Sequence, residues 1–140
     1  MPSDAQLKQI LQETRVIAMV GASMNPDRPS YSVMRFLLSK GKRVIPVNPG
    51  HAGKELQGQR VYACLADIPS NTAVDMVDVF RKSEAVEAVV TEAAAHLPYL
   101  RTVWLQLGVH SDKGAELARG ANATMVQNRC PAIEWPRLGL

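Results

Sequence analysis

Cysteine and histidine are both scarce in this sequence. The 140 residues include 2 cysteines, Cys64 and Cys130, which are far apart and belong to no Cys-x-x-Cys motif. A disulfide framework and a cysteine-based zinc site are therefore not expected. The 3 histidines, His51, His96 and His110, lack the spacing of helical metal sites. We expect no metal site and a reducing, cytoplasmic location.

Long apolar runs and blocks of like charge are also missing. No apolar run approaches the roughly 18 residues that a membrane-spanning helix needs, and the polar start, Met1 to Gln6, does not resemble a secretory signal. The chain carries 16 Lys and Arg against 13 Asp and Glu, a formal charge of +3 spread along its length. Membrane and nucleic-acid binding are therefore not expected, whereas a small anionic ligand suits this balance.

The remaining composition is that of an ordinary globular protein. Hydrophobic residues make up 46% of the chain, charged residues 21% and aromatic residues only 5%. The length allows one hydrophobic core but not two. We therefore expect a single domain over residues 1–140, with one binding site.

Strand and helix patterns alternate along the chain. Continuous apolar runs predict strands buried on both faces, at 15–20, 43–47, 74–80, 102–107 and 124–126. Between them, helical patterns begin at Ser3, Ser30, Ser83, and Ser111 or Asp112, where these side chains can cap a helix. Pro46 should shorten or interrupt the second strand. Residues 61–62 are expected to be extended, 65–69 a helical turn and 128–140 a loop.

This alternation determines the expected fold. Repeated strand–helix units force parallel pairing with right-handed crossovers. We therefore predict an α/β fold: a doubly wound, mainly parallel, five-stranded sheet with helices on both faces, in the three-layer, Rossmann-like arrangement. Such sheets bind ligands outside the carboxyl ends of their strands. The expected site is formed by the loops that follow Val20, Val47, Phe80 and Leu107.

The loop after the first strand, 21–30, has the composition of a phosphate site. It connects a buried strand to the start of a helix, where free amides and the helix dipole favour an anion. Gly21 and Ala22 would let a phosphate approach the backbone, and Ser23 and Arg28 would add donors. The loop also exceeds the roughly 2–6 residues that are usual for such connections. The alternative is a long connection in which a serine caps a turn.

Two features argue against NAD as the ligand. In the Gly-x-Gly-x-x-Gly fingerprint only Gly21 is present, because Ser23 and Pro26 replace the other two glycines. The second strand ends in Val47-Asn48-Pro49, without the acidic residue that holds the ribose of NAD. A phosphorylated ribose would instead favour basic side chains. Those near the expected strand ends are Arg28, Arg43, His51, Lys54, Arg81 and Lys82, each of which alone could be a solvated surface charge.

No catalytic arrangement emerges from the residue pattern. Ser23 is not part of a Gly-x-Ser-x-Gly elbow. Asp75 and Asp78 lie three apart in one predicted strand and should point to opposite faces, so they do not form an acid–base pair. Trp104, within an apolar strand, is expected in the core.

Seven short motifs, taken in order, resemble the small stand-alone CoA-binding proteins, whose domain is similar to the nucleotide-binding domain of the succinyl-CoA synthetase α subunit. The resemblance covers nearly the whole chain. The motifs are Val20-Gly21-Ala22-Ser23, Arg28-Pro29-Ser30-Tyr31, Ile45-Pro46-Val47-Asn48-Pro49, Leu65-Ala66-Asp67-Ile68-Pro69, Val77-Asp78-Val79-Phe80-Arg81, Val103-Trp104-Leu105-Gln106-Leu107-Gly108-Val109 and Arg129-Cys130-Pro131-Ala132-Ile133-Glu134.

The resemblance implies that coenzyme A or an acyl-CoA is the ligand. Its pyrophosphate would lie over Gly21 to Ser23, and its adenosine would lie between Asn48-Pro49 and 80–82. The implied ligand-binding residues are Gly21, Ala22, Ser23, Asn25, Pro26, Arg28, Ser30, Tyr31, Asn48, Pro49, His51, Phe80, Arg81, Lys82 and Gln106. The synthetases carry their phosphorylated histidine in a second domain that this sequence lacks, so we expect a carrier, sensor or regulatory role without catalysis.

Two other classes of function stay open. One is an enzyme that uses NAD(P) or an acyl-CoA, with Gln106, His110 or Cys130 near the chemistry. The other is an interaction protein with a vestigial cleft, in which Cys130 forms a mixed disulfide with CoA or a partner. The sequence does not determine the oligomeric state, because the apolar segment 132–136 could dock on its own sheet or on a second copy in a homodimer.

Overall fold

The computed structural model describes all 140 residues, which form one sheet of five strands, a small hairpin and five α-helices. The elements are α1 (Asp4–Glu13), β1 (Val16–Val20), α2 (Pro29–Ser39), β2 (Arg43–Val47), β3 (Glu55–Leu56), β4 (Gln59–Arg60), β5 (Met76–Val79), α3 (Val86–His96), β6 (Thr102–Leu105), α4 (Asp112–Gly120), β7 (Thr124–Val126) and α5 (Pro131–Arg137). Three short 3₁₀ helices cover Pro49–His51, Leu65–Asp67 and Ser83–Ala85.

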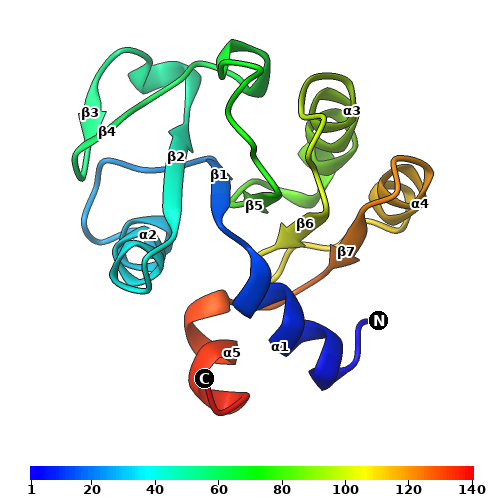
Figure 1. Ribbon diagram of the computed structural model, residues 1–140. Coiled ribbons are helices and arrows are strands. Elements are labelled where there is room, and N and C mark those ends of the chain that lie inside the picture. Colours follow the sequence, from blue (N-terminus) through cyan, green and yellow to red (C-terminus); the bar gives the residue numbers. More distant parts are fainter.

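The main sheet is parallel throughout, with the strand order β2-β1-β5-β6-β7. Helices α3 and α4 cover one face, and α1, α2 and α5 cover the other (Figure 1). The chain runs outward from β1 to β2 and then returns to β5 on the other side of β1, so the strand order reverses between β1 and β5. The predicted fold class is confirmed, and this reversal marks the carboxyl ends of β1 and β5 as the place where a ligand is expected.

Each face of the sheet has its own hydrophobic core. Because side chains alternate along a strand, β5 directs Val77 and Val79 toward α3 and α4, and Met76 and Asp78 toward the opposite layer. Trp104 is completely buried on that second face, and its indole Nε1 donates to the carbonyl of Arg129 at 2.7 Å. The expectation that Trp104 belongs to the core is confirmed.

The predicted loop at 128–140 is wrong, because most of it is the helix α5. Cys130 precedes the helix and Pro131 occupies its first turn, a position where proline needs no amide hydrogen. Glu134 is buried and pairs with Arg129 at 3.0 Å and with Arg137 at 2.7 Å, while Trp135 packs edge-on against Phe36 of α2. The two prolines of the segment indicate a loop when only sequence is considered, whereas these tertiary contacts stabilise a helix.

Three further expectations about local structure need correction. Pro46 does not interrupt β2, because β2 is an edge strand. The Arg43 amide donates to the carbonyl of Arg15, just before β1, so by alternation the nitrogen of Pro46 faces away from β1, where no ladder hydrogen bond is lost. Ser30 lies inside α2 rather than capping it, since Arg28 is the N-cap and Pro29 the first helical residue. The β3–β4 hairpin was not predicted, because its strands have only two residues each.

The amino-terminal helix is tied to the last helix by an ion pair, which gives a pH-dependent prediction. Arg137 of α5 donates to both carboxylate oxygens of Asp4 at 2.9 and 3.0 Å, and these hydrogen bonds lower the pKa of Asp4 below its ordinary value of 3.8. The pair therefore stabilises the fold above the ordinary pKa, and this stability is lost as the pH falls through the lowered value. Asp4→Asn is expected to lower the thermal midpoint at pH 7, and this difference should shrink as the pH falls below 3.8. Asp112→Asn, at the start of α4 without an ion pair, is the control; equal effects of both variants at pH 7 would contradict the prediction.

Candidate functional site

A cavity of about 640 Å³ lies at the carboxyl ends of β1 and β2, between these strands and α3. Its lining is mostly apolar, with Val20 and Val47 at the strand ends and Ala88 and Val89 on the helix. It also contains five of the residues predicted for the site, namely Gly21, Asn48, Pro49, Phe80 and Arg81. The edge of the sheet predicted from sequence therefore carries a cavity, of the size and character of a small-molecule site.

A second, more polar cavity of about 250 Å³ lies between the loop after β1 and the start of α2. It is lined by the predicted residues Gly21, Ser23, Arg28, Ser30 and Phe80, together with Pro29. Because Gly21 and Phe80 line both cavities, the two are adjacent. One is suited to an apolar ring, and the other carries the free cation Arg28, which takes part in no ion pair.

Glycine is required at position 21, because the backbone conformation and the packing there leave no room for a side chain. Its φ is +84°, in the left-handed region, and a Cβ at this position would lie 2.3 Å from the carbonyl oxygen of Phe80. The amides of Gly21 and Ala22 both donate to the carbonyl of Val47, at 3.0 and 3.3 Å. These two amides are thus occupied within the chain, so a phosphate that approaches the backbone here would need other donors. The glycine instead brings the end of β1 against β5.

The rest of the loop after β1 is held by its own short side chains. The Ser23 amide donates to Ser30 Oγ at 3.0 Å, the Asn25 amide donates to Ser23 Oγ at 3.0 Å, and the Asp27 amide donates to Asn25 Oδ1 at 2.9 Å. The amides of Met24 and Ser30 have no acceptor within the chain. The donors left for an anion are therefore these two amides, the hydroxyl hydrogens of Ser23 and Ser30, and the Arg28 guanidinium, a set that fits a phosphate group.

Asn48 has a structural role at the end of β2. Its Nδ2 donates to the carbonyl of Ala22 at 2.8 Å, and its Oδ1 accepts from the Gly50 amide at 2.9 Å. Both ends of the amide are thus used to join the loop after β1 to the 3₁₀ turn after β2. Asn48 shapes the larger cavity, while its polar atoms are already paired.

The structure does not bring all predicted residues to the two cavities. The seven that line neither cavity are Ala22, Asn25, Pro26, Tyr31, His51, Lys82 and Gln106. Ala22 is buried in the core, whereas Asn25, Pro26 and Lys82 are exposed around the rim. Tyr31 is half-buried on α2, and its carbonyl accepts from Gln57 Nε2. His51 is half-buried, with Nδ1 unpartnered.

Asp78 is the residue that sequence reasoning missed. It is completely buried on the central strand β5, and neither of its carboxylate oxygens has a hydrogen-bond partner. Burial alone raises its pKa well above the ordinary value of 3.8. The nearby Gln106, 6% exposed, also has its Oε1 buried and unpartnered. The signal in the sequence is a single acidic residue inside an apolar strand. The search for an acid–base pair treats Asp78 only as a possible partner of Asp75.

The two cysteines and His110 lie in different surroundings. Cys64 lines the larger cavity, where burial raises the pKa of its thiol, and Cys130 is buried in the core below α5. No histidine lines either cavity: His110 is exposed, and its amide donates to Ser83 Oγ. The structure also groups no three potential metal ligands. A reactive role for Cys130 or His110 therefore finds no support in these contacts.

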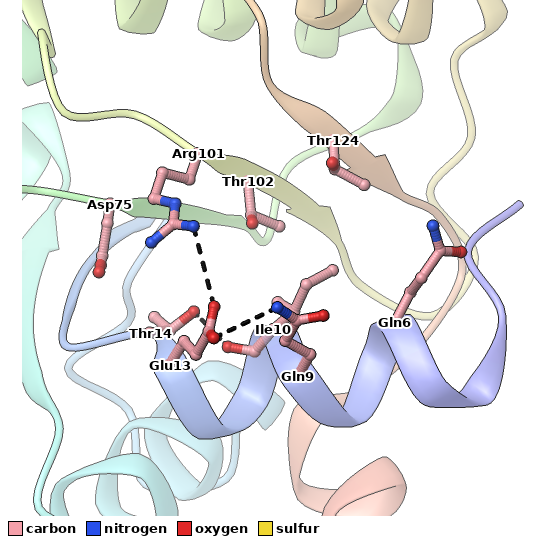
Figure 2. A pocket seen from close by; sticks show the side chains of 9 residues that line it. All are labelled: Gln6, Gln9, Ile10, Glu13, Thr14, Asp75, Arg101, Thr102 and Thr124. Carbon is pink, nitrogen blue, oxygen red and sulfur yellow. Dashed lines mark hydrogen bonds and ion pairs between the residues drawn. The ribbon is translucent and has the colours of Figure 1, made fainter.

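Another cavity, of about 210 Å³, lies at the opposite, amino-terminal edge of the sheet. Figure 2 shows polar side chains of α1 facing the strand starts across it. Several of the lining groups are paired. Gln9 donates to Glu13 at 3.2 Å, Glu13 lies 3.8 Å from Arg101, and the Asp75 carboxylate accepts from the amides of residues 15 and 16. Of these contacts, the exposed ion pair of Glu13 with Arg101 joins α1 to the residue that precedes β6. No helix in the structure has the length and apolar character needed to cross a membrane.

Comparison with known proteins identifies a family for this chain. A family model described as a CoA-binding domain matches residues 15–136. The uncharacterized protein YneT of Bacillus subtilis (strain 168) is 32% identical over 133 residues, which cover 92% of this chain and 91% of YneT. A Thermus thermophilus structure, cell-free ID.343, superimposes with a TM-score of 0.89 at 35% identity, covering 98% of this chain and 99% of that one.

A more distant structure shows that the same fold occurs inside a larger enzyme. The dinucleotide-forming acetyl-coenzyme A synthetase 1 of Ca. Korarchaeum cryptofilum has a TM-score of 0.66 at 22% identity, over 83% of this chain and 26% of the synthetase. At this identity the likeness concerns the fold alone. The family match, in contrast, extends over nearly all of the sequence from β1 to α5. The chain therefore belongs to the CoA-binding domain family.

Proposed function

We propose that this protein binds coenzyme A, free or as an acyl-CoA, at the carboxyl ends of its parallel strands, and that it does so without catalysing a reaction. The observation that carries the proposal is the pair of adjacent cavities that share Gly21 and Phe80. The larger, apolar cavity suits the adenine ring. The smaller one offers Arg28 and free hydroxyl and amide hydrogens, which suit the phosphates.

A binding role without catalysis is supported by what lines the two cavities. The one thiol there, Cys64, has a raised pKa, which lowers its thiolate fraction and its reactivity. Neither cavity contains a histidine that could act as a general base. The role that follows is that of a CoA carrier, a CoA sensor or a regulatory CoA-binding protein.

The experiment that tests the proposal is thermal unfolding of the ligand-free protein with CoA, acetyl-CoA, dephospho-CoA, NAD and NADPH in parallel. A ligand at 100 times its Kd adds about 2.7 kcal/mol to the free energy of unfolding. We expect CoA and acetyl-CoA to raise the midpoint, and dephospho-CoA to raise it less because it lacks the 3′-phosphate. A rise with NAD or NADPH alone would overturn the proposal, and so would no rise with any of the five.

Removing the polar side chains of the smaller cavity should weaken binding specifically. In Ser23→Ala/Arg28→Ala, calorimetry is expected to show at least a tenfold loss of CoA affinity, because charge-assisted hydrogen bonds to phosphate contribute about 1.5–3 kcal/mol. The matched control is Ser39→Ala/Arg35→Ala, which changes the same residue types on the exposed far part of α2. Unchanged affinity in the first variant would place the phosphates elsewhere.

A further inference from the structure

Two unpartnered buried polar groups lie on the same face of the sheet, toward its carboxyl edge. Both carboxylate oxygens of Asp78 and the Oε1 of Gln106 are buried without a hydrogen-bond partner. Buried polar groups in proteins are nearly always hydrogen-bonded, and an unsatisfied one destabilises the fold. Their presence on adjacent strands at the ligand-binding edge therefore calls for a functional explanation.

The sheet register brings these two side chains within reach of each other. Asp78 of β5 is paired with Trp104 of β6, and the Gln106 amide continues the ladder by donating to the carbonyl of Val79 at 3.3 Å. Gln106 follows Trp104 by two residues, so alternation places its side chain on the same face as Asp78. Such diagonal neighbours have backbones about 7–8 Å apart, which long side chains can span. Gln106 lies on the ligand-facing side of Asp78, since it is nearer the carboxyl edge.

The two ends of the Gln106 amide lie in different surroundings. Its oxygen is buried, whereas its nitrogen reaches the surface and makes no hydrogen bond within the chain. A neutral carboxyl at position 78 has one hydrogen to donate, and an amide oxygen is a suitable acceptor. A hydrogen bond from Asp78 to Gln106 Oε1, formed when the ligand is bound, would hold the amide with its nitrogen toward the ligand. The opposite orientation would present an oxygen, which repels a carbonyl group.

We propose that Asp78, in its neutral form, is a positioning residue that holds the Gln106 side chain so that Nε2 donates to a carbonyl oxygen of the bound ligand. The inference rests on the proposed function, since the pantetheine arm of CoA supplies such carbonyls. From Gly21 at the end of β1, the arm would cross Phe80 at the end of β5 and reach Gln106 after β6. At about 4.8 Å per strand this path is about 10 Å long. The ligand group recognised here is an amide or thioester carbonyl.

The test compares two ligands with four variants by calorimetry. CoA carries the pantetheine arm, and adenosine 3′,5′-bisphosphate lacks it. We expect Asp78→Leu and Gln106→Leu each to weaken CoA binding about five- to tenfold, which is the effect of one hydrogen bond, and to leave bisphosphate binding unchanged. Asp78→Asn retains a donor at this position and is expected to keep the affinity for CoA within about threefold of the original protein. In Asp78→Leu/Gln106→Leu, the loss should be no larger than in Gln106→Leu alone.

A structural role for Asp78 alone would give a different pattern. Asp78→Leu would then weaken both ligands equally, or its effect would be additive with that of Gln106→Leu, and either result would overturn the inference. Unchanged CoA affinity in Asp78→Leu would also overturn the inference, but it would not contradict the proposed function. If the original protein binds neither ligand, both the proposed function and this inference are wrong. As a second readout, the side-chain NH₂ resonances of Gln106 should shift on addition of CoA in the original protein and in Asp78→Asn, but not in Asp78→Leu.

Discussion

Asp78→Asn is expected to make the protein more stable at pH 7, because it removes the cost of keeping a buried carboxyl protonated, about 1.4 kcal/mol for each unit by which burial raises its pKa. In the ligand-free structure the Asp78 carboxyl is completely buried without a hydrogen-bond partner, and no neighbouring charge offsets its burial. Asparagine has nearly the same shape and is neutral at every pH. Asp78→Leu removes the unpaired polar atoms as well and should be stabilised at least as much. Urea unfolding at pH 7 measures both.

The pH dependence separates this effect from a simple packing change. Because burial raises the pKa of Asp78, the native state keeps a proton that the unfolded chain releases above pH 3.8. Stability from this group therefore falls as the pH rises from about 4 toward the raised pKa. The advantage of Asp78→Asn should be absent below pH 4 and grow toward pH 7. A variant that is less stable than the original protein at every pH would show that Asp78 has a partner in the native state.

A gain in stability would also strengthen the interpretation of the binding experiment. A variant that folds more stably and binds CoA less tightly cannot have lost affinity through unfolding. The combination is expected where a protein keeps a destabilising group for its function. Asp78 would then lower the stability of the free protein and contribute to binding only when Gln106 contacts the ligand.

Much of the fold could be predicted because the strands are buried on both faces. Such strands appear as continuous apolar runs, and the helices between them have clear apolar stripes, so the parallel sheet and its carboxyl edge follow from periodicity alone. Helix α5 could not be predicted in this way. Its stability comes from the pairing of Glu134 with Arg129 and Arg137 and from the contact of Trp135 with Phe36, residues that only the tertiary structure brings together.

The candidate site was predictable in position but not in detail. Residue type and loop order identified Gly21, Ser23, Arg28 and Phe80, which do line the cavities. The same reasoning let a phosphate approach the backbone at Gly21 and Ala22, where the carbonyl of Val47 already accepts from both amides. Which amide donates to which carbonyl depends on the exact approach of two strand ends, and no residue pattern specifies it. Whether the lining residues bind CoA stays a prediction for the variants at Ser23 and Arg28 to test.

Glu134→Ala is expected to have the largest destabilising effect, about 3 kcal/mol or more. The Glu134 carboxylate is 5% exposed and accepts from Arg129 at 3.0 Å and from Arg137 at 2.7 and 3.0 Å. Removing one partner of a buried ion pair leaves an uncompensated charge, which costs about 3–5 kcal/mol. In Glu134→Ala the group left without its ion-pair partner is the guanidinium of Arg129, which is half-buried and whose Nε already lacks a hydrogen-bond partner.

The control for this prediction is Glu116→Ala, which removes an exposed ion pair with Lys113 at 3.7 Å. Pairs of that kind contribute about 1 kcal/mol or less. Urea unfolding should therefore separate the two variants clearly, and double replacement with Arg129→Met should recover part of the loss, because no buried charge is then left alone. If Glu134→Ala cost no more than Glu116→Ala, the buried pair would not be what holds α5 against the sheet. The Arg137 contact to Asp4, which Glu134→Ala leaves in place, would then be the main tie between α5 and the rest of the fold.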